Sequence, residues 1–459
     1  MNVFSLLSKN FIPFDVEGVG SVSLNWIGKI ISWIFDAFSG VYGGAILGVV
    51  IFTLILKTIV LPLDAYSRVK TKKQALIMEE MRPQMEKLKK QYANDNKIYS
   101  QKVMELQKQH GYSPLSACLP MIVSLVIFII VIGAFSTYSN YAIINTYNDM
   151  VGAYNASVET YVSAVYKTDS AGNVVVVDGE VQYEEVNADG FLRKEPYMVD
   201  GNFVSDGYVA DYDKFLLVWE EFKATSDDAT VIAEIDGLIE KYGEGGANAQ
   251  NFMDDAVVSF VQLNARREAA KYYRESKKNY TFGWIGNVWY PDSALNKVVP
   301  NYKNFKSSIS RASTASAASY EESYNEVTYY LRNADPANPG VKLEANTPNG
   351  YFVLIVLAIG LMFLQQFVLT RSQKAATELS SVDGSAAKTN KWMMIIMPII
   401  YGVFSFFYSA AFSTYMIINT SYGLLTTLLI NKLVAIRFAK YGVTTKRKQI
   451  ASNNRKRLK

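Results

Sequence analysis

The position of Lys57 points to chemistry more clearly than that of any other residue. Residues 45–63 read AILGVVIFTLILKTIVLPL and contain no other charged side chain. In a helix that rises ~1.5 Å per residue, Lys57 lies about 5 Å from the centre of this stretch. An ammonium group at that depth of a bilayer costs at least ~2.5–3.5 kcal/mol, so a functional role is the default expectation. The alternative is that its side chain snorkels toward the boundary at Leu63, about 9 Å away.

Few other residues could support catalysis. The chain has one Cys, Cys118, and one His, His110, which argues against a disulfide framework and against a zinc site built from Cys and His. His110 lies in a basic, Gln-rich stretch without a nucleophile signature beside it, which disfavours a Ser-His-Asp hydrolase. The GEGGAN run at 243–248 lacks the preceding strand and the Lys of a phosphate-binding loop. We therefore expect neither an enzyme nor a bound cofactor or metal.

Helices that cross a membrane must position Lys57. Half of the 459 residues are apolar and 19% are charged, which excludes a disordered chain. Four stretches reach the ~20 apolar residues that a bilayer core requires. They are residues 42–63, 115–136, 351–370 and 392–431, and the last is long enough that we divide it near Tyr408–Ser413. The sequence therefore predicts an all-α membrane core of five helices, with the two termini on opposite sides.

The distribution of Lys and Arg predicts the orientation of these helices. Residues 64–114, 371–391 and 432–459 together hold 25 basic and 8 acidic side chains, whereas residues 137–350 hold 18 basic and 31 acidic ones. Basic segments remain in the cytoplasm. We therefore expect residues 1–41 and 137–350 on the outer side, and the C-terminal tail in the cytoplasm.

The two outer segments differ in pattern. In residues 1–41 we find no cleaved signal peptide, but apolar residues recur at helical spacing from Leu24 to Phe38, which predicts an amphipathic helix in the outer interface or an ordinary packed helix. In residues 137–350, Asp-Gly pairs at 178–179 and 200–201 predict two β-hairpins. Helical patterns follow in this segment, so we expect an α+β insertion. The helical patterns cover residues 213–224, 229–242 and 251–278.

Residues 64–114 predict a cytoplasmic hairpin of two antiparallel helices, broken at Asn94–Asn96, with a thin apolar seam that includes Ile98 and Val103. Its lysines allow two functions: attraction to anionic lipid, worth ~1 kcal/mol each, or docking of a negatively charged partner. The basic tail allows contact with ribosomal RNA or simple orientation of the chain. The candidate partner-binding residues are Lys72, Lys73, Lys87, Lys89, Lys90, Lys446, Arg447 and Lys448.

The predicted spans contain no acidic residue that could neutralise Lys57. They do contain neutral polar side chains, which could line a water-filled groove or could serve as helix-packing groups. We interpret the pattern as a positively charged groove that attracts acidic or polar segments of another polypeptide. The candidate groove residues are Lys57, Thr53, Ser124, Gln365, Gln366 and Asn419.

Several runs resemble segments of the YidC/Oxa/Alb membrane protein insertases, and the order of the predicted elements agrees as well. The matching runs are ILKTIVLPL (55–63), EEMRPQMEKLKKQY (79–92), HGYSPLSACLP (110–120), WIGNVWYPDS (284–293), MFLQQ (362–366) and KWMMIIMP (391–398). The resemblance implies a bacterial plasma-membrane insertase that works without nucleotide hydrolysis. Its groove, open to the cytoplasm and the lipid, would receive the polar end of a client and let the apolar helix slide into the bilayer. Implied partners are nascent client proteins, the Sec translocon, the signal recognition particle pathway and the ribosome.

The sequence also departs from that family. Lys57 stands where the family usually has arginine, Ser124 and Val126 stand where it tends to have Gln and Pro, and residues 141–278 have no recognised counterpart. One alternative is a transporter or channel with an outer solute-binding domain, which predicts broken or repeated helices and a paired charge in the membrane. Neither feature is found in the sequence. A receptor with an outer sensing domain would leave Lys57 and the hairpin unexplained.

Overall fold

The computed structural model describes residues 14–429, together with 432, 433 and 436, apart from positions 15, 21, 23, 25, 111–113, 200–201, 247, 313–318 and 379–384. It describes the backbone but not the side chains at residues 67–68, 71–76, 78–80, 96, 114–125, 198–199, 202, 204–205, 312, 371–378, 385–387, 389–390 and 393. The chain forms two compact units. The helical unit comprises the described residues of 24–139, 279–296 and 349–459, and the mixed unit comprises those of 1–23, 140–278 and 297–348.

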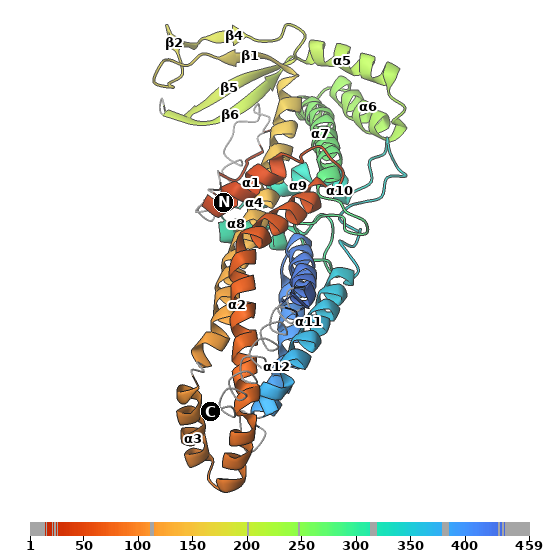
Figure 1. Ribbon diagram of the computed structural model, residues 1–459. Helices are drawn as coiled ribbons and strands as arrows, with labels where there is room; N and C mark the ends of the chain where they lie inside the picture. The colour runs from red at the N-terminus through yellow and green to blue at the C-terminus, as the bar shows by residue number, and fades with distance from the viewer. Residues whose placement is uncertain are drawn as a thin grey trace, which may run out of the picture. The chain divides into compact units, whose positions relative to one another are not determined.

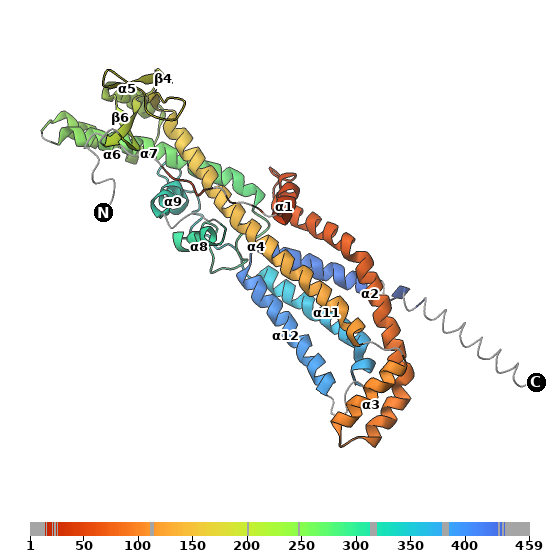
Figure 2. The same cartoon turned by 90° about the vertical axis from the view of Figure 1, so that its left-hand side faces the viewer.

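The helical unit is built from long helices (Figure 1). Its labelled helices are α1 (Trp26–Asp36), α2 (Gly44–Gln91), α3 (Asn96–Gln109), α4 (Pro114–Glu159), α11 (Val353–Glu378) and α12 (Ser385–Phe407). After α12 the helix breaks at 408–409 and a further helix covers residues 410–429. Helix α4 continues from this unit into the mixed unit. Helices α11 and α12 run side by side, as Figure 2 shows from a second direction.

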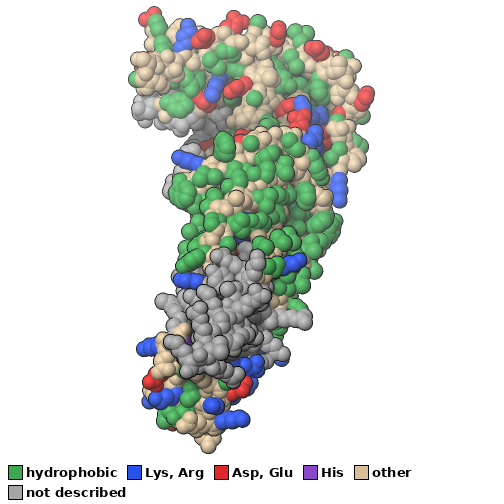
Figure 3. All heavy atoms as spheres, viewed as in Figure 1, with side chains coloured by type: hydrophobic (Ala, Val, Ile, Leu, Met, Phe, Trp, Pro, Cys, Tyr) green, Lys and Arg blue, Asp and Glu red, His purple; other side chains and the backbone are tan. Residues whose placement is uncertain are grey.

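Three helices in the described part of the chain are long and apolar enough to cross a membrane, namely Gly44–Tyr66, Val126–Glu159 and Val353–Thr370. A shorter apolar helix, Met394–Phe407, lies within the fourth predicted span. Apolar side chains cover much of the surface over these helices (Figure 3), and Ile59 is 70% exposed. An exposed apolar surface of this kind is expected where lipid takes the place of water. The protein is therefore a mostly helical, multi-pass membrane protein.

The hairpin of α2 and α3 has a small apolar core. Asp95 follows the turn between the two helices and caps α3, because its side chain accepts hydrogen bonds from the backbone N–H groups of Lys97 and Ile98. Met81 and Met85 of α2 pack against Tyr99 and Val103 of α3. The prediction from the apolar pattern that Ile98 lies in this seam is wrong, because Ile98 is 40% exposed whereas Tyr99 is 2% exposed. Tyr99 and Val103 are four residues apart and share a helix face, and Ile98 lies one position off that face.

The mixed unit contains a four-stranded sheet in the order β4-β1-β5-β6. Strands β1 and β5 are parallel, and the other neighbours in this sheet are antiparallel. The short strands β2 and β3 form a separate ribbon. The strand bounds are β1 (Val162–Tyr166), β2 (Val176–Val177), β3 (Glu180–Val181), β4 (Tyr183–Glu185), β5 (Leu192–Val199) and β6 (Asn202–Ala210).

Both predicted hairpins are confirmed. Strands β2 and β3 join through Asp178 and Gly179, whose φ angles of 52° and 85° are those of a type I′ turn. Strands β5 and β6 pair as far as Val199 opposite Asn202, at the second Asp-Gly pair. The three predicted helices are present as well, followed by shorter ones. The helices are α5 (Tyr212–Thr225), α6 (Ala229–Gly243), α7 (Ala249–Ser276), α8 (Tyr302–Ala312), α9 (Glu321–Val327) and α10 (Tyr329–Arg332).

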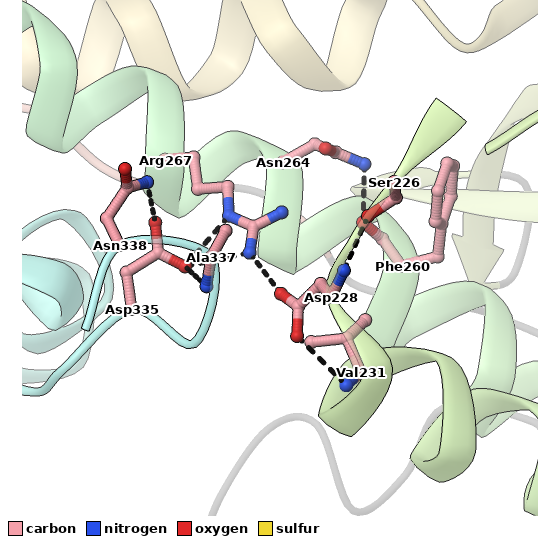
Figure 4. A network of polar contacts seen from close by, with 9 residues as sticks. All are labelled: Ser226, Asp228, Val231, Phe260, Asn264, Arg267, Asp335, Ala337 and Asn338. Atoms are coloured by element: carbon pink, nitrogen blue, oxygen red, sulfur yellow. Dashed lines mark hydrogen bonds and ion pairs between the residues drawn. The ribbon is translucent and has the colours of Figure 1, made fainter. Parts of the chain in front are cut away.

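Helix α7 is tied to its surroundings in the mixed unit by an arginine between two carboxylates (Figure 4). Arg267 Nη2 lies 2.5 Å from Asp228 Oδ2 and 2.7 Å from Asp335 Oδ1. Asp228 also caps α6 by accepting from the Val231 N–H, and Asp335 accepts from the Ala337 N–H. Both aspartates are buried, so Arg267 neutralises two charges that could not remain unpaired there.

Candidate functional site

Helix α2 carries Thr53 and Lys57 on one face. Val49 and Thr53 are fully buried, and Lys57, one turn further along, is partly buried. On other sides of the same helix Ile55 and Ile59 are exposed by 46% and 70%. Because residues four apart share a face, Lys57 continues the buried stripe of α2 rather than its apolar exposed surface.

Helix α11 brings Gln365 against the 410–429 helix. A methyl group placed at Gly423 would lie 2.8 Å from Gln365 Nε2, so the amide rests on the backbone of Gly423. Asn419 lies one turn before Gly423, on the same face of that helix. Gln365, Gln366 and Asn419 are all partly buried. The structure therefore brings the amides of Gln365 and Asn419 to neighbouring helix faces, and it also packs α2 against α11.

Three buried threonines of the helical unit, Thr53, Thr426 and Thr427, donate hydrogen bonds to their own helices. Thr53 Oγ1 donates to the Val49 carbonyl at 2.6 Å, and Thr427 Oγ1 donates to the Gly423 carbonyl at 2.5 Å. A hydroxyl that is satisfied by the preceding turn needs no water and no ligand. By contrast, in the described part of the chain no hydrogen bond joins the amides of Gln365, Gln366 or Asn419 to another residue. The amides are therefore better candidates than the threonines for contact with water or a client.

Some hydroxyls hold the helices together at the break after α12. Ser139 Oγ lies 3.0 Å from Ser409 Oγ, which joins α4 to that break. Ser413 donates to the carbonyl of Ser405, and both side chains are fully buried. Ser405 and Ser413 are among the polar side chains of the predicted spans that could line a groove or pack helices, and their contacts are those of packing groups.

Several candidate residues lie outside the described residues. Ser124, Lys72 and Lys73 belong to helices whose side chains are not described there. Lys446, Arg447 and Lys448 fall beyond the described end of the chain. Their assignment to the groove or to a partner surface stays a prediction from sequence.

Three of the candidate partner-binding lysines, Lys87, Lys89 and Lys90, are described and lie near the end of α2. Lys87 and Lys90 are exposed and Lys89 is partly buried. Lys87 and Lys90 lie off the face of α2 that bears the buried methionines, so their side chains are exposed to solvent. On α3, a hydrogen bond to Glu105 raises the pKa of the exposed Lys102. This surface can attract negative charge, in lipid or protein.

The connection 279–296, which contains the run WIGNVWYPDS, supplies a functional residue that its sequence pattern did not predict. Asp292 is fully buried and accepts hydrogen bonds from the Tyr351 N–H at 2.8 Å and the Leu354 N–H at 2.6 Å. It therefore caps the start of α11, the helix that carries Gln365. Asp292 precedes the capped residues Tyr351 and Leu354 by 59 and 62 positions, so no local sequence pattern predicts this cap.

Among the residues that the structure describes, no cluster of His, Cys, Asp and Glu side chains could hold a metal ion. The helical unit offers the partly buried Lys57, the amides of Gln365 and Asn419, and an exposed apolar surface. They suit the recognition of a polypeptide or a lipid.

Comparison with known proteins adds a family. The family of 60Kd inner membrane proteins matches residues 34–165 and 266–437. Three similar proteins, each named membrane protein insertase YidC, come from Fusobacterium nucleatum (36% identical over 98 residues), Francisella philomiragia (30% over 106) and Leptospira interrogans (33% over 120). These matches cover 21%, 23% and 26% of this chain, but 44%, 18% and 18% of the relatives. The chain thus spans less than half the length of these relatives. No solved structure matches it.

Proposed function

Because the chain belongs to the 60Kd inner membrane protein family, we propose that it is a membrane protein insertase and chaperone. The observation that carries the proposal is the family match itself, since it includes Lys57, Gln365 and Asn419 together with the helices that bear them. The insertase names of the relatives support the same function. They give no support to a transporter or channel.

We propose a core of five spans, in which α12 and the 410–429 helix are the fourth and fifth. The length and apolar character of α2, α4 and α11 support the first three. The excess of Lys and Arg in residues 64–114, 371–391 and 432–459 supports a cytoplasmic position for these segments, with the N-terminus and residues 137–350 outside. A bacterial plasma membrane is the proposed location.

In the proposed mechanism, Lys57 and the amides of Gln365, Gln366 and Asn419 line a hydrophilic groove with Thr53 and Ser124. The groove is open to the cytoplasm and to lipid. A client inserts its polar end there, where the ammonium group of Lys57 attracts acidic groups and the amides offer hydrogen bonds that lipid cannot. The client's apolar helix then moves sideways into the bilayer, driven by burial of its apolar surface and without nucleotide hydrolysis.

We propose two partner surfaces beside the groove. The hairpin of α2 and α3, with Lys72, Lys73, Lys87, Lys89 and Lys90, receives clients or contacts the Sec translocon and the signal recognition particle pathway. The basic tail with Lys446, Arg447 and Lys448 contacts the ribosome. The exposure of Lys87 and Lys90 supports the first of these assignments.

Insertion into vesicles by the purified full chain tests this function. The client is a single-span protein with an acidic polar tail, and protease protection of the tail measures its insertion. Lys57→Arg keeps the charge and should insert the client at nearly the normal rate. Lys57→Ala should lower the rate roughly tenfold, as the loss of one charge-assisted contact predicts. Lys57→Glu should lower it further, because it repels the tail.

An exposed lysine outside the proposed surfaces provides the matched control. Lys303→Ala on α8 of the mixed unit removes the same charge and should leave insertion unchanged. Full activity of both Lys57→Ala and Lys57→Glu would contradict the role of the groove charge. Failure of the unchanged protein to insert any single-span client would contradict the insertase function itself.

A further inference from the structure

The connection 279–296, which we call the capping loop, has an unusual distribution of charge. Its sequence, NYTFGWIGNVWYPDSALN, contains only one residue of the types Asp, Glu, Lys, Arg and His, namely Asp292. That carboxylate is fully buried and both of its oxygens accept backbone N–H groups at the start of α11. The capping loop therefore presents no charged side chain to its surroundings, although Lys278 and Lys297 flank it and are exposed.

Three helices of the helical unit begin at the capping loop. The carboxylate of Asp292 caps α11. The carbonyl oxygens of Tyr290 and Val288 accept hydrogen bonds from the N–H groups of Ala410 and Ala411, at 2.8 and 2.9 Å, where the 410–429 helix begins. These contacts supply acceptors for the first N–H groups of two helices, which lack partners within their own helix.

The start of α2 meets the same loop. Asn279 Oδ1 accepts from the Gly40 N–H at 2.7 Å, and the ring of Phe282 lies 3.2 Å from where a Cβ atom would stand on Gly43. Gly43 has a φ of 68° and immediately precedes α2. Phe282 therefore packs on the one residue at which the chain turns into its first span.

These contacts fix the depth of the capping loop in a membrane. The candidate spans of α2 and α11 begin at Gly44 and Val353, within one or a few residues of the groups that bond to the loop. A span begins where the hydrocarbon core ends, so the loop lies at the level of the lipid headgroups. This is the layer in which Trp and other aromatic side chains gather in membrane proteins.

The exposed residues of the capping loop match that layer. Leu295 is 76% exposed, Phe282 is 41% exposed and Trp284 is 38% exposed. Phe282 and Trp284 flank Gly283, whose φ of 56° allows the tight turn between Phe282 and Ile285. The turn thus presents two large aromatic side chains at a position where the backbone is held by its own hydrogen bonds.

We propose that the capping loop is a lipid-binding element that inserts Phe282, Trp284 and Leu295 into the headgroup layer. The bilayer is the occupant because the loop adjoins the starts of the spans and carries no exposed charge to specify a protein partner. Its buried backbone contacts hold the starts of α11 and the 410–429 helix, so the lipid contact also sets the depth of the helices that bear Gln365 and Asn419. The proposal concerns the membrane surface and does not depend on insertase activity.

Spin labels on the full chain test the proposal. Cys118 is the only cysteine, so Cys118→Ser allows one label at a time. Leu295→Cys is labelled, and the protein is reconstituted in vesicles of phosphatidylcholine and phosphatidylglycerol. Accessibility to oxygen, which concentrates in lipid, is compared with accessibility to a water-soluble nickel chelate. We expect the ratio of oxygen to nickel accessibility to be several-fold higher than at an aqueous site.

Leu217→Cys is the matched control. Leu217 on α5 is 73% exposed, nearly as much as Leu295, but Asp213, Lys214, Glu220 and Glu221 lie within one turn of it. Its label should contact the nickel chelate freely. Trp284→Cys, labelled in the same way, provides a second position should the label at 295 disturb folding. Nickel accessibility at 295 and 284 equal to that at 217 would overturn the proposal, and so would labels shielded from both reagents, since that result indicates a protein contact.

Discussion

The two units bury polar groups in different ways. In the mixed unit, buried carboxylates pair with arginines: Asp228 and Asp335 with Arg267, and Glu344 with Arg274. In the described part of the helical unit, the buried hydroxyls of Thr53 and Thr427 donate to their own helices, and the buried carboxylate of Asp292 accepts hydrogen bonds from backbone N–H groups. In the mixed unit, arginine side chains thus neutralise the buried carboxylates. In the helical unit, backbone N–H groups stabilise the buried carboxylate of Asp292.

The difference follows from the solvent around each unit. Next to water, an arginine and a carboxylate lose only part of their hydration, and a pair can link segments that are distant in the sequence. Next to lipid, each charge carries a larger penalty and each backbone group needs a partner within the protein. A charge retained in the helical unit is therefore expected to have a specific task, as a cap at Asp292 or as the proposed client contact at Lys57.

The largest effect should come from removing the arginine that serves two carboxylates. Arg267→Ala leaves Asp228 and Asp335 buried without their cation, and a broken buried pair costs about 3–5 kcal/mol. Hydrogen exchange of the α6 amides in the full chain should rise accordingly. Lys271→Ala is the matched control on the same helix, because Lys271 pairs with Glu268 in an exposed position worth about 0–1 kcal/mol. Equal exchange rates of the α6 amides in the two variants would contradict the claim that buried ion pairs stabilise the mixed unit.

A smaller loss should follow from removing the cap in the helical unit. Asp292→Ala deprives two N–H groups of a charged acceptor, and hydrogen bonds to charged groups contribute about 1.5–3 kcal/mol. Exchange of the amides at 351–356 should accelerate, while the amides of α6 keep their protection. Asp292→Asn retains one acceptor oxygen and should show an intermediate rate. Unchanged exchange in the alanine variant would show that the backbone at α11 does not need this carboxylate.

The close contact of Gln365 with Gly423 should produce a smaller effect of a different kind. Gly423→Ala places a methyl group 2.8 Å from Gln365 Nε2. The amide ends a flexible side chain that can shift, so the cost should lie at the low end of the ~1–3 kcal/mol that overpacking typically causes. Thermal unfolding in detergent should show the loss. Gln365→Ala in the same chain removes the clash and should restore most of the stability. If the second substitution adds to the loss instead, the two helices do not meet through this pair.

Local patterns predicted much of the fold. The Asp-Gly pair at 178–179 specifies its hairpin because the turn needs two residues that tolerate positive φ, and Asp and Gly are among the few that do. The helices α5, α6 and α7 follow from apolar periodicity. Ile98 was misplaced because one residue rotates a side chain by ~100° around the helix, which periodicity over a short, polar helix does not resolve.

The candidate site was less predictable. Lys57 stands out in the sequence because charge in an apolar stretch is costly. The contact of Gln365 with Gly423 and the cap from Asp292 to Leu354 join residues about 60 apart, and no local propensity encodes them. Thr53, like the amides, appears in the sequence as a neutral polar residue within an apolar span, yet its hydroxyl donates a hydrogen bond to its own helix. Only the three-dimensional partners distinguish a packing group from one that remains available.

The smallest effect should be a difference in acid sensitivity between the units. Burial alone would raise the pKa of Glu344, but hydrogen bonds from Arg274 and Lys277 outweigh it and lower that pKa below its ordinary value. A lowered pKa in the folded state means that Glu344 stabilises the mixed unit fully above the ordinary pKa of ~4.3, and that this contribution is lost as the pH falls through the folded value. Hydrogen exchange at 328–345, corrected for its intrinsic pH dependence, should therefore rise in acid, and less steeply in Glu344→Gln. Glu268→Gln, an exposed change on α7, should keep the original profile. An identical profile in Glu344→Gln would mean that ion pairing at Glu344 does not govern the acid response of the mixed unit.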